Sequence, residues 1–236
     1  MKKYTFLIAS FVIFVKIATA QDSLDRKHLI VKIAPLTIFD IDNTFEFSAE
    51  HSLSKNNRWT LSEQLGYGAG VANIWQEESS KYGNTREHYR VKLEARRYRH
   101  ARPDMTGGYM AYEVFYKQVN DRINRNIGRE CENGPCNYYE NLDYPASKYV
   151  VGGTIKAGYQ HRFKNEFKKN TNFVFDLYIG LGIRRVMIDH KVDVQVSESP
   201  WFYYGGNEWF GSFGSKDRAY NIPHASFGIR FGYFIF

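Results

Sequence analysis

Long apolar runs are scarce in this 236-residue chain. After Gln21, no stretch reaches the roughly 18 consecutive apolar residues that mark a membrane-spanning helix, and the mean hydropathy is −0.50. These absences exclude a bundle of transmembrane helices. They do not exclude a β-barrel, because a barrel strand needs lipid-compatible side chains on only one of its two faces.

Cysteine is equally scarce, with two residues, Cys131 and Cys136. The intervening Asn133-Gly134-Pro135 is a strong turn signal, so a disulfide at a loop tip is predicted if the chain is exported to an oxidising compartment. Half of a metal site is the competing interpretation, but no second ligand pair has suitable spacing. Two free thiols is the remaining alternative. The sequence therefore predicts no metal and no cofactor.

A long basic block is also missing. The formal net charge is +7, and Lys2, Lys3 and Lys16 belong to an N-terminal leader, which leaves +4 for the rest. Because this excess is spread along the chain, nucleic acid is not an expected partner.

The N-terminus is typical of a secretory signal peptide. Two lysines precede an apolar run of about a dozen residues, and Ala18-Thr19-Ala20 supplies the small residues of a cleavage site before Gln21. A membrane anchor is the alternative, but the run is too short to span a bilayer. No cysteine follows the cut, which argues against a lipoprotein anchor. We expect residues 1–20 to be removed and residues 21–236 to form a single domain.

Period-two alternation of apolar and polar residues is the dominant positive signal, and it predicts β-strands. Aromatic residues make up 17% of the chain, with 18 Tyr and 18 Phe, which suits the aromatic girdles of a membrane barrel. Glu63 interrupts the apolar face of one segment, through either a bulge or a misassigned register. The predicted strands are residues 28–39, 44–53, 58–71, 87–98, 108–119, 148–162, 171–186 and 222–236.

The connections alternate in length. Those at residues 54–57, 99–107 and 163–170 are short, whereas those at 72–86, 120–147 and 187–221 are long; the short link at 40–43 is the exception. Short periplasmic turns and longer extracellular loops are the pattern of outer-membrane barrels. The predicted fold is therefore all-β: an eight-stranded antiparallel up-and-down transmembrane β-barrel with both termini in the periplasm. A soluble exported β-sandwich is the alternative.

The polar faces of these strands carry charges in mid-strand. An eight-stranded barrel has an interior just wide enough to be filled by side chains, and buried charges must be paired. We therefore expect a closed lumen crossed by ion pairs, which disfavours a narrow pore. The predicted lumen charge network consists of Glu46, Glu50, Arg90, Lys92, Glu94, Arg96, Lys156, Asp176 and Arg230.

With these features in place, the chain resembles the small outer-membrane β-barrels of the OmpA and OmpX type. Phe236 at the end of an alternating strand resembles the signal recognised by the barrel assembly machinery. The segment Val31-Lys32-Ile33-Ala34-Pro35-Leu36, followed by Phe45-Glu46-Phe47, resembles the opening hairpin of a barrel family of unknown function. The resemblance implies an integral location in the bacterial outer membrane, as a monomer among outer-membrane lipid and lipopolysaccharide.

An enzymatic alternative comes from His224-Ala225-Ser226. It is similar to the His-x-Ser pair of a lipid A deacylase of the same architecture, in which a histidine activates a serine nucleophile. Glu198, Glu208 or Asp189 would supply the third group. The plain alternative is a chance pair, since the alternation directs both side chains into the barrel, away from acyl chains.

The external loops favour a binding role. An aromatic and glycine-rich segment at residues 199–213 suits stacking on a glycan or docking of a protein, or it rests on the rim as an aromatic belt. The leading hypothesis is a non-enzymatic outer-membrane barrel with a structural or surface-interaction role through its loops. The candidate contact residues are Trp201, Phe202, Tyr203, Tyr204, Trp209 and Phe210.

Overall fold

The computed structural model describes residues 29–39, 44–53, 57–69, 86–100, 102, 104–130, 136–164, 170–191 and 218–235. The predicted leader, Cys131 and the aromatic segment at 199–213 lie outside these residues, so the predictions made for them stay predictions. Within the described ranges, no helix is long and apolar enough to cross a membrane.

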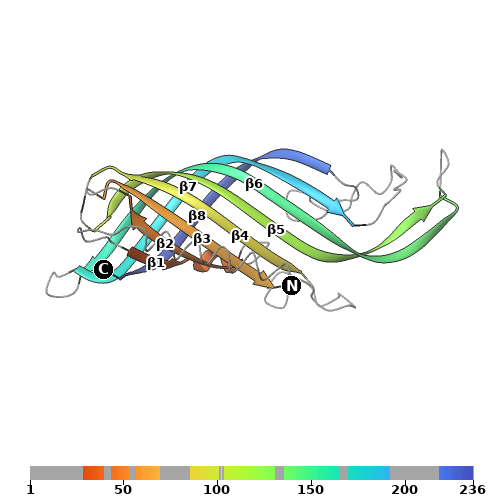
Figure 1. The fold of residues 1–236 in the computed structure, drawn as a ribbon, viewed down its shortest axis with the longest axis horizontal. Coiled ribbons are helices and arrows are strands. Elements are labelled where there is room, and N and C mark those ends of the chain that lie inside the picture. The colour runs from red at the N-terminus through yellow and green to blue at the C-terminus, as the bar shows by residue number, and fades with distance from the viewer. Residues whose placement is uncertain are drawn as a thin grey trace.

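The protein is all-β, and its strands form one antiparallel sheet in which neighbours in sequence are neighbours in the sheet. The first and last strands also pair, from Ile30↔Phe234 to Ile33↔Phe231, so the sheet closes into a ring (Figure 1). The strands described are β1 (Leu29–Ile33), β2 (Phe45–Ser52), β3 (Trp59–Ala69), β4 (Glu87–Tyr98), β5 (Gly107–Arg129), β6 (Tyr138–Lys164), β7 (Asn170–His190) and β8 (Arg218–Phe234).

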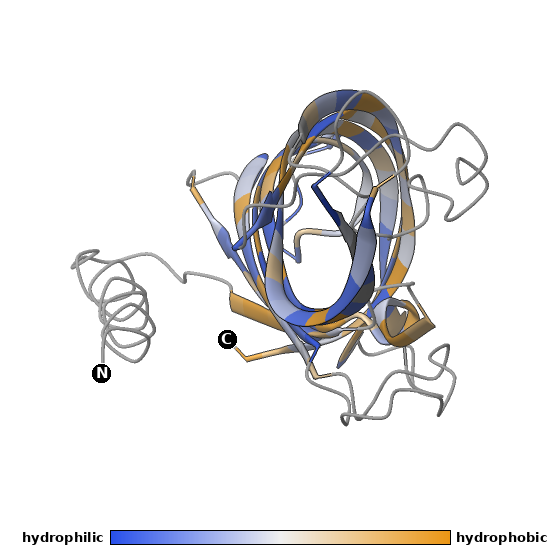
Figure 2. Cartoon of the chain, turned by 90° about the vertical axis from the view of Figure 1, so that its right-hand side faces the viewer, coloured by the Kyte–Doolittle hydropathy of each residue, from blue (hydrophilic) through white to orange (hydrophobic). Residues whose placement is uncertain are grey.

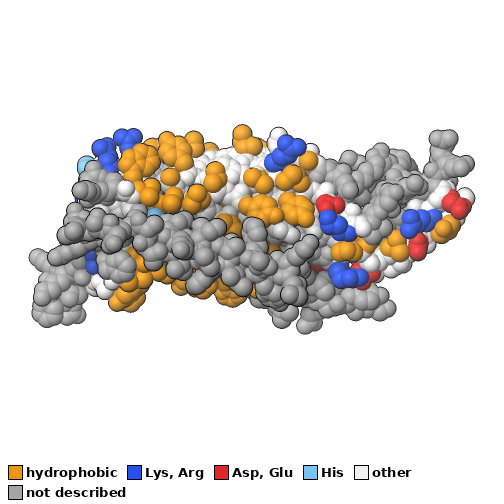
Figure 3. All heavy atoms as spheres, in the orientation of Figure 1, with side chains coloured by type: hydrophobic (Ala, Val, Ile, Leu, Met, Phe, Trp, Pro, Cys, Tyr) orange, Lys and Arg blue, Asp and Glu red, His pale blue; other side chains and the backbone are white. Residues whose placement is uncertain are grey.

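The two faces of the ring differ sharply in polarity. On β7, Leu177, Ile179 and Leu181 are 49%, 68% and 73% exposed, whereas Asp176, directly before Leu177, is fully buried. Seen along the ring in Figure 2, the strands enclose a central interior, and Figure 3 shows apolar side chains gathered over the middle of the outer surface. The period-two alternation read from the sequence thus places apolar residues outside and charged residues inside.

Glu63 needs no bulge. The register runs continuously through it, as Ala49↔Glu63 toward β2 and Glu63↔Leu93 toward β4. Its side chain lies on the outer face, with an oxygen 3.9 Å from Nδ1 of His51. The alternation was therefore right, and Glu63 is a polar residue on an otherwise apolar face.

The first predicted strand is too long. β1 ends at Ile33, and a 3-10 helix, η1 (Pro35–Phe39), follows. Pro35 has no N–H for a sheet ladder, and the hydroxyl of Thr37 donates a hydrogen bond to the carbonyl of Ala34 at 2.6 Å. The connection from β1 to β2 therefore spans residues 34–44, which is longer than the sequence reading gave.

The predicted loop at 120–147 is largely a hairpin. Residues 121–129 of β5 and 138–145 of β6 pair only with each other, because the β4–β5 register ends at Glu87↔Asn120 and the β6–β7 register ends at Ala146↔His190. This two-stranded extension, called the arm below, projects beyond the ring (Figure 1). Its exposed ion pairs include Arg122–Asp143 at 3.1 Å and Arg129–Glu140 at 3.0 Å.

Apolar clusters lie inside the ring on either side of its charged centre. One surrounds the turn between β4 and β5, close to the C-terminus, and includes Ile30, Tyr98, Met105 and Phe234. The other packs between β5, β6, β7 and β8 toward the arm, and its buried members are Val119, Ala146, Val150, Val186, Ile188 and Ile222. The charged side chains between these clusters are the candidate site.

Candidate functional site: the charged interior

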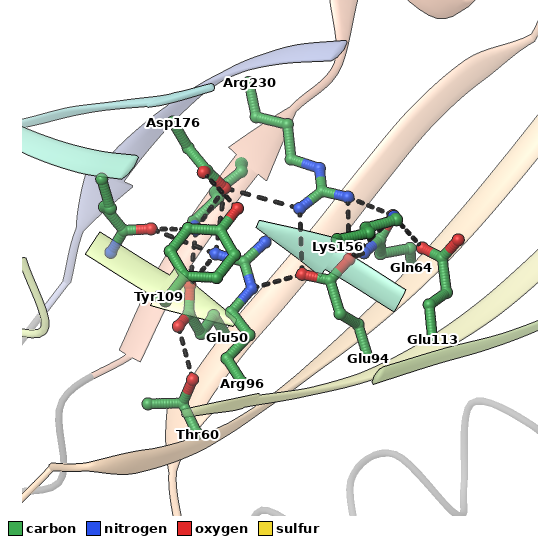
Figure 4. Close-up of polar contacts among 12 residues, drawn as sticks. Glu50, Thr60, Gln64, Glu94, Arg96, Tyr109, Glu113, Lys156, Asp176 and Arg230 are labelled. Carbon is green, nitrogen blue, oxygen red and sulfur yellow. Dashed lines mark hydrogen bonds and ion pairs between the residues drawn. The ribbon is translucent and has the colours of Figure 1, made fainter. Parts of the chain in front are cut away.

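Eight charged residues form a connected layer across the interior of the ring. Glu94 of β4 is one centre of this layer: its carboxylate accepts from Nε of Arg96 at 2.5 Å, from Nζ of Lys156 at 3.0 Å and from Nη2 of Arg230 at 3.1 Å (Figure 4). Lys156 also binds Glu113. The ion-pair layer, as it is called below, consists of Lys32, Glu50, Glu94, Arg96, Glu113, Lys156, Asp176 and Arg230.

Asp176 and Glu50 form the second centre of the layer. Nη1 of Arg96 lies 2.9 Å from a carboxylate oxygen of each of these acids. Nζ of Lys32 lies 2.5 Å from Glu50 and 3.2 Å from Asp176. Each of these four side chains is completely buried. They come from β1, β2, β4 and β7, so their contacts cross the interior of the ring.

The ion-pair layer is electrically balanced, with four cations and four carboxylates. Neutral groups add hydrogen bonds to its carboxylates: Tyr109 donates its hydroxyl to Asp176 at 2.6 Å, and Thr60 donates to Glu50 at 2.6 Å. The ring of Tyr178 lies 4.2 Å from the guanidinium of Arg230 and 4.3 Å from Nζ of Lys156. Buried charges persist only when paired and hydrogen-bonded, and here both conditions are met for each of the four carboxylates.

The structure places the side chains of all nine predicted network residues inside the ring. Eight of the nine are buried, and Lys92 is partly exposed. Six of them belong to the ion-pair layer; Glu46, Arg90 and Lys92 form a separate group, in which Glu46 lies 2.8 Å from Lys92 and 3.6 Å from Arg90.

Sequence reasoning missed several members of the layer. Lys32 and Glu113 carry charge and lie on the polar faces of their strands, so the alternation alone would have included them. Two amides that hydrogen-bond to the layer were also missed: Gln64 accepts from Arg230 at 3.3 Å, and Gln160 accepts from Lys32 at 2.5 Å. Because glutamine is uncharged, the sequence does not indicate that these two residues contact the ion-pair layer.

A cavity of about 660 Å³ lies beside the layer, on the side of the arm. Among the described residues that line it, five are basic and one, Glu113, is acidic. Glu113 pairs with Lys156, and Arg90 and Lys92 pair with Glu46. Nε of Arg184 is buried without a hydrogen-bond partner among the described residues. We call this cavity the basic chamber; its basic residues are Arg90, Lys92, Lys117, Lys148 and Arg184.

His224 and Ser226 both line the basic chamber from β8. The imidazole packs on the ring of Phe115, with 5.0 Å between centroids. Asp189 lies on the outer face, paired with Lys191. It also lies seven residues along β7 from Gly182, the register partner of His224, which is about 23 Å of strand. Asp189 therefore cannot orient His224; Glu198 and Glu208 lie outside the described residues.

The two cysteines and the loop aromatics are the remaining site residues predicted from the sequence. Among the described residues, no group of three or more His, Cys, Asp or Glu side chains is arranged to hold a metal ion. Cys136 is half-buried two residues before β6, and its predicted partner Cys131 lies outside the described part of the chain. The loop candidates Trp201, Phe202, Tyr203, Tyr204, Trp209 and Phe210 lie outside it as well.

No family model, no curated protein and no solved structure matches this chain. The geometry of the ring, its charged interior and its outer surface therefore carry the functional proposal.

Proposed function

We propose that the protein is an eight-stranded transmembrane β-barrel of a bacterial outer membrane, with both termini in the periplasm. The observation that carries this proposal is the polarity of the ring: an apolar outer surface surrounds a buried, charge-balanced ion-pair layer. Water would favour the opposite arrangement, because a soluble sheet buries its apolar face. Lipid favours the observed one, since a lipid-exposed strand alternates apolar-out and polar-in.

Within that membrane, the barrel is a closed, non-enzymatic scaffold that carries a surface for interactions. The ion-pair layer fills the cross-section of the interior, which speaks against a pore. The exposed apolar residues of the outer surface, such as Leu177, Ile179 and Leu181, are called the apolar belt below. The arm, with its exposed Tyr138 and Tyr139 and its paired charges, extends past this belt and suits contact with an extracellular glycan or protein. The barrel assembly machinery and lipopolysaccharide are the further partners expected of such a protein.

A hydrolase acting on lipid A is the weaker candidate. Ser226 and His224 share a cavity, but the described residues offer no carboxylate that both faces the imidazole and remains unpaired by a lysine. A triad needs that third group to hold the imidazole in the correct tautomer.

The membrane proposal is tested by placing a charge on the outer face. Leu181→Arg introduces arginine at a residue that is 73% exposed in the middle of the apolar belt. In lipid this change costs about 2–4 kcal/mol of unfolding free energy near the bilayer midplane, measured by urea titration of protein folded into phosphatidylcholine vesicles.

The matched control is Tyr139→Arg, at a 64%-exposed residue of the arm, where we expect a change within about 0.5 kcal/mol because the site faces water. Equal small effects for the two variants, or recovery of the native protein in the soluble periplasmic fraction, would overturn the membrane assignment.

A further inference from the structure

The pairing of β8 with β1 that closes the ring is much shorter than β8 itself. β8 runs from Arg218 to Phe234, yet its register with β1 covers only Phe231 to Phe234. Toward the arm, within the described residues, no strand pairs with β8 on the β1 side, and η1 lies there instead. We call this stretch between η1 and the β8 residues 223–230 the seam.

The sequence of β8 is adapted to an unpaired edge. Ile235 donates its backbone N–H to the carbonyl of Leu29 at 2.9 Å, so the odd-numbered amides at this end of β8 point toward β1. Amide direction alternates along a strand, and the β7–β8 register has no shift. Pro223 belongs to the same odd-numbered set, and proline is tolerated in a sheet where its missing N–H would face an open edge.

The seam lies at the level of the apolar belt. The register pairs Ile229 of β8 with Leu177, and Pro223 with Ile183. Leu177 and Ile183 are exposed apolar residues, at 49% and 67%. An unpaired sheet edge at membrane depth is tolerated only where protein covers it or where it borders a water-filled cavity. The basic chamber behind the seam meets that condition.

The basic chamber reaches the outer surface through the seam. Its lining includes inward residues of β8, such as His224 and Ser226, and also outward residues of the same strand, such as Ala225 and Phe227. A cavity lined by both faces of one strand passes around the edge of that strand. Leu36 and Phe39 of η1, which are 38% and 61% exposed, form the opposite side of the mouth.

We propose that the basic chamber binds a phosphate-bearing lipid that enters sideways from the bilayer through the seam. The mouth is apolar, which suits acyl chains, and the described lining of the inside carries five basic residues and one acid, with Arg90 and Lys92 sharing Glu46. Arg184 supplies a buried guanidinium nitrogen without a described partner, suited to a phosphate oxygen. The volume of about 660 Å³ falls within the size range of small-molecule sites. This inference rests on the proposed membrane location.

The test measures lipid retained by the full chain. Protein folded into phosphatidylcholine vesicles containing phosphatidylglycerol is extracted into mild detergent, and bound lipid is quantified by native mass spectrometry. We expect a single retained phosphatidylglycerol. Arg184→Gln should reduce its retention about tenfold, the effect of losing one charge-assisted hydrogen bond. The adjacent Arg185→Gln, on the outer face, should leave it unchanged.

A second pair of variants tests the route. Ala225→Trp fills the mouth of the seam without changing the basic residues of the chamber. It should abolish the retention of phosphatidylglycerol. Ala157→Trp makes the same change at an outward residue of β6 away from the seam, and should retain lipid as the parent does.

Equal retention in all five proteins would overturn the proposal. So would retention that inorganic phosphate removes from the parent and that Ala225→Trp leaves intact, because the chamber would then be a site for soluble anions reached from outside. A chain that inserts into the vesicles yet shows either result contradicts the lipid site alone. A chain that fails to insert contradicts the membrane proposal as well.

Discussion

At the scale of single residues, Glu94 is the most heavily used acceptor of the interior. Its carboxylate meets Arg96, Lys156 and Arg230 from three different strands, and its side chain is fully buried. A buried ion pair is strongly destabilised when one partner is neutralised, because the remaining charge has neither its counter-ion nor water. We therefore expect the ion pairs of Glu94 to contribute more to stability than the exposed ion pairs of the arm.

We predict that Glu94→Gln lowers the free energy of unfolding by about 3–5 kcal/mol, the cost of breaking a buried pair. Urea titration of the vesicle-embedded protein, followed by gel mobility without heating, measures the change. Glu63→Gln is the control: that carboxylate lies on the outer face, with the imidazole of His51 at 3.9 Å. A loss at Glu94 no larger than the loss at Glu63 would contradict the role assigned to the layer.

At the scale of elements, close approach between β6 and β7 depends on glycine. A Cβ added to Gly182 would lie 2.0 Å from the carbonyl oxygen of Gly153, so that backbone atoms would have to move. By contrast, a Cβ added to Gly108 meets nothing nearer than a backbone oxygen at 4.0 Å. β6 and β7 can approach this closely at Gly182 only because the contact lacks a side chain.

Gly182→Ala is consequently expected to destabilise the protein by about 1–3 kcal/mol, as overpacking does, whereas Gly108→Ala should be nearly neutral. Thermal unfolding of the two variants in the same detergent compares them directly. Equal midpoints would mean that the strands separate at little cost and that the close approach is not required.

The arm is a second element with its own energetics. Its strands pair only with each other, and its ion pairs are exposed, where such pairs contribute little. Tyr144, however, is buried against the ring of His190, with 5.7 Å between centroids, so the arm is anchored at its base.

Replacing residues 124–143 by Asn-Gly, a two-residue hairpin turn, should therefore leave the unfolding free energy within about 0.5 kcal/mol of the parent value. The same denaturant titration measures it. A large loss would show that the arm supports the ring, in which case it is a structural element and not only a surface for interactions.

At the scale of the whole molecule, the balanced ion-pair layer separates two unequal halves of the interior. On the side of the C-terminus, Ile30, Tyr98, Met105 and Phe234 belong to an apolar cluster. On the side of the arm lies the basic chamber. A continuous water path would have to cross both the cluster and the layer. The interior is therefore closed along its length, and only the basic chamber opens, through the seam.

We predict no unitary conductance steps when the protein is reconstituted in planar bilayers, at potentials that leave the bilayer intact. Protein heated to unfolding before reconstitution is the control for detergent leakage. Regular steps whose size scales with salt concentration would contradict the closed interior and restore the narrow pore as an interpretation.

The sequence by itself determined the elements that depend on local alternation. Eight period-two segments, their outward and inward faces, and the nine interior charges could all be read from residue order, because each strand places successive side chains on opposite faces. The reading failed where that signal is absent. Residues 34–39 turn at Pro35 into a 3-10 helix, and residues 120–129 and 138–147 pair as strands although they lack a regular apolar–polar alternation.

Only the tertiary structure decided which charges meet, and where the ring is incomplete. Arg96 lies between Glu50 and Asp176 because β2, β4 and β7 face one another across the interior, and a one-dimensional pattern contains no such distances. The seam is likewise invisible in sequence, since it results from β8 being longer than its register with β1. Alternation fixes the direction of a side chain; closure of the sheet fixes its neighbours.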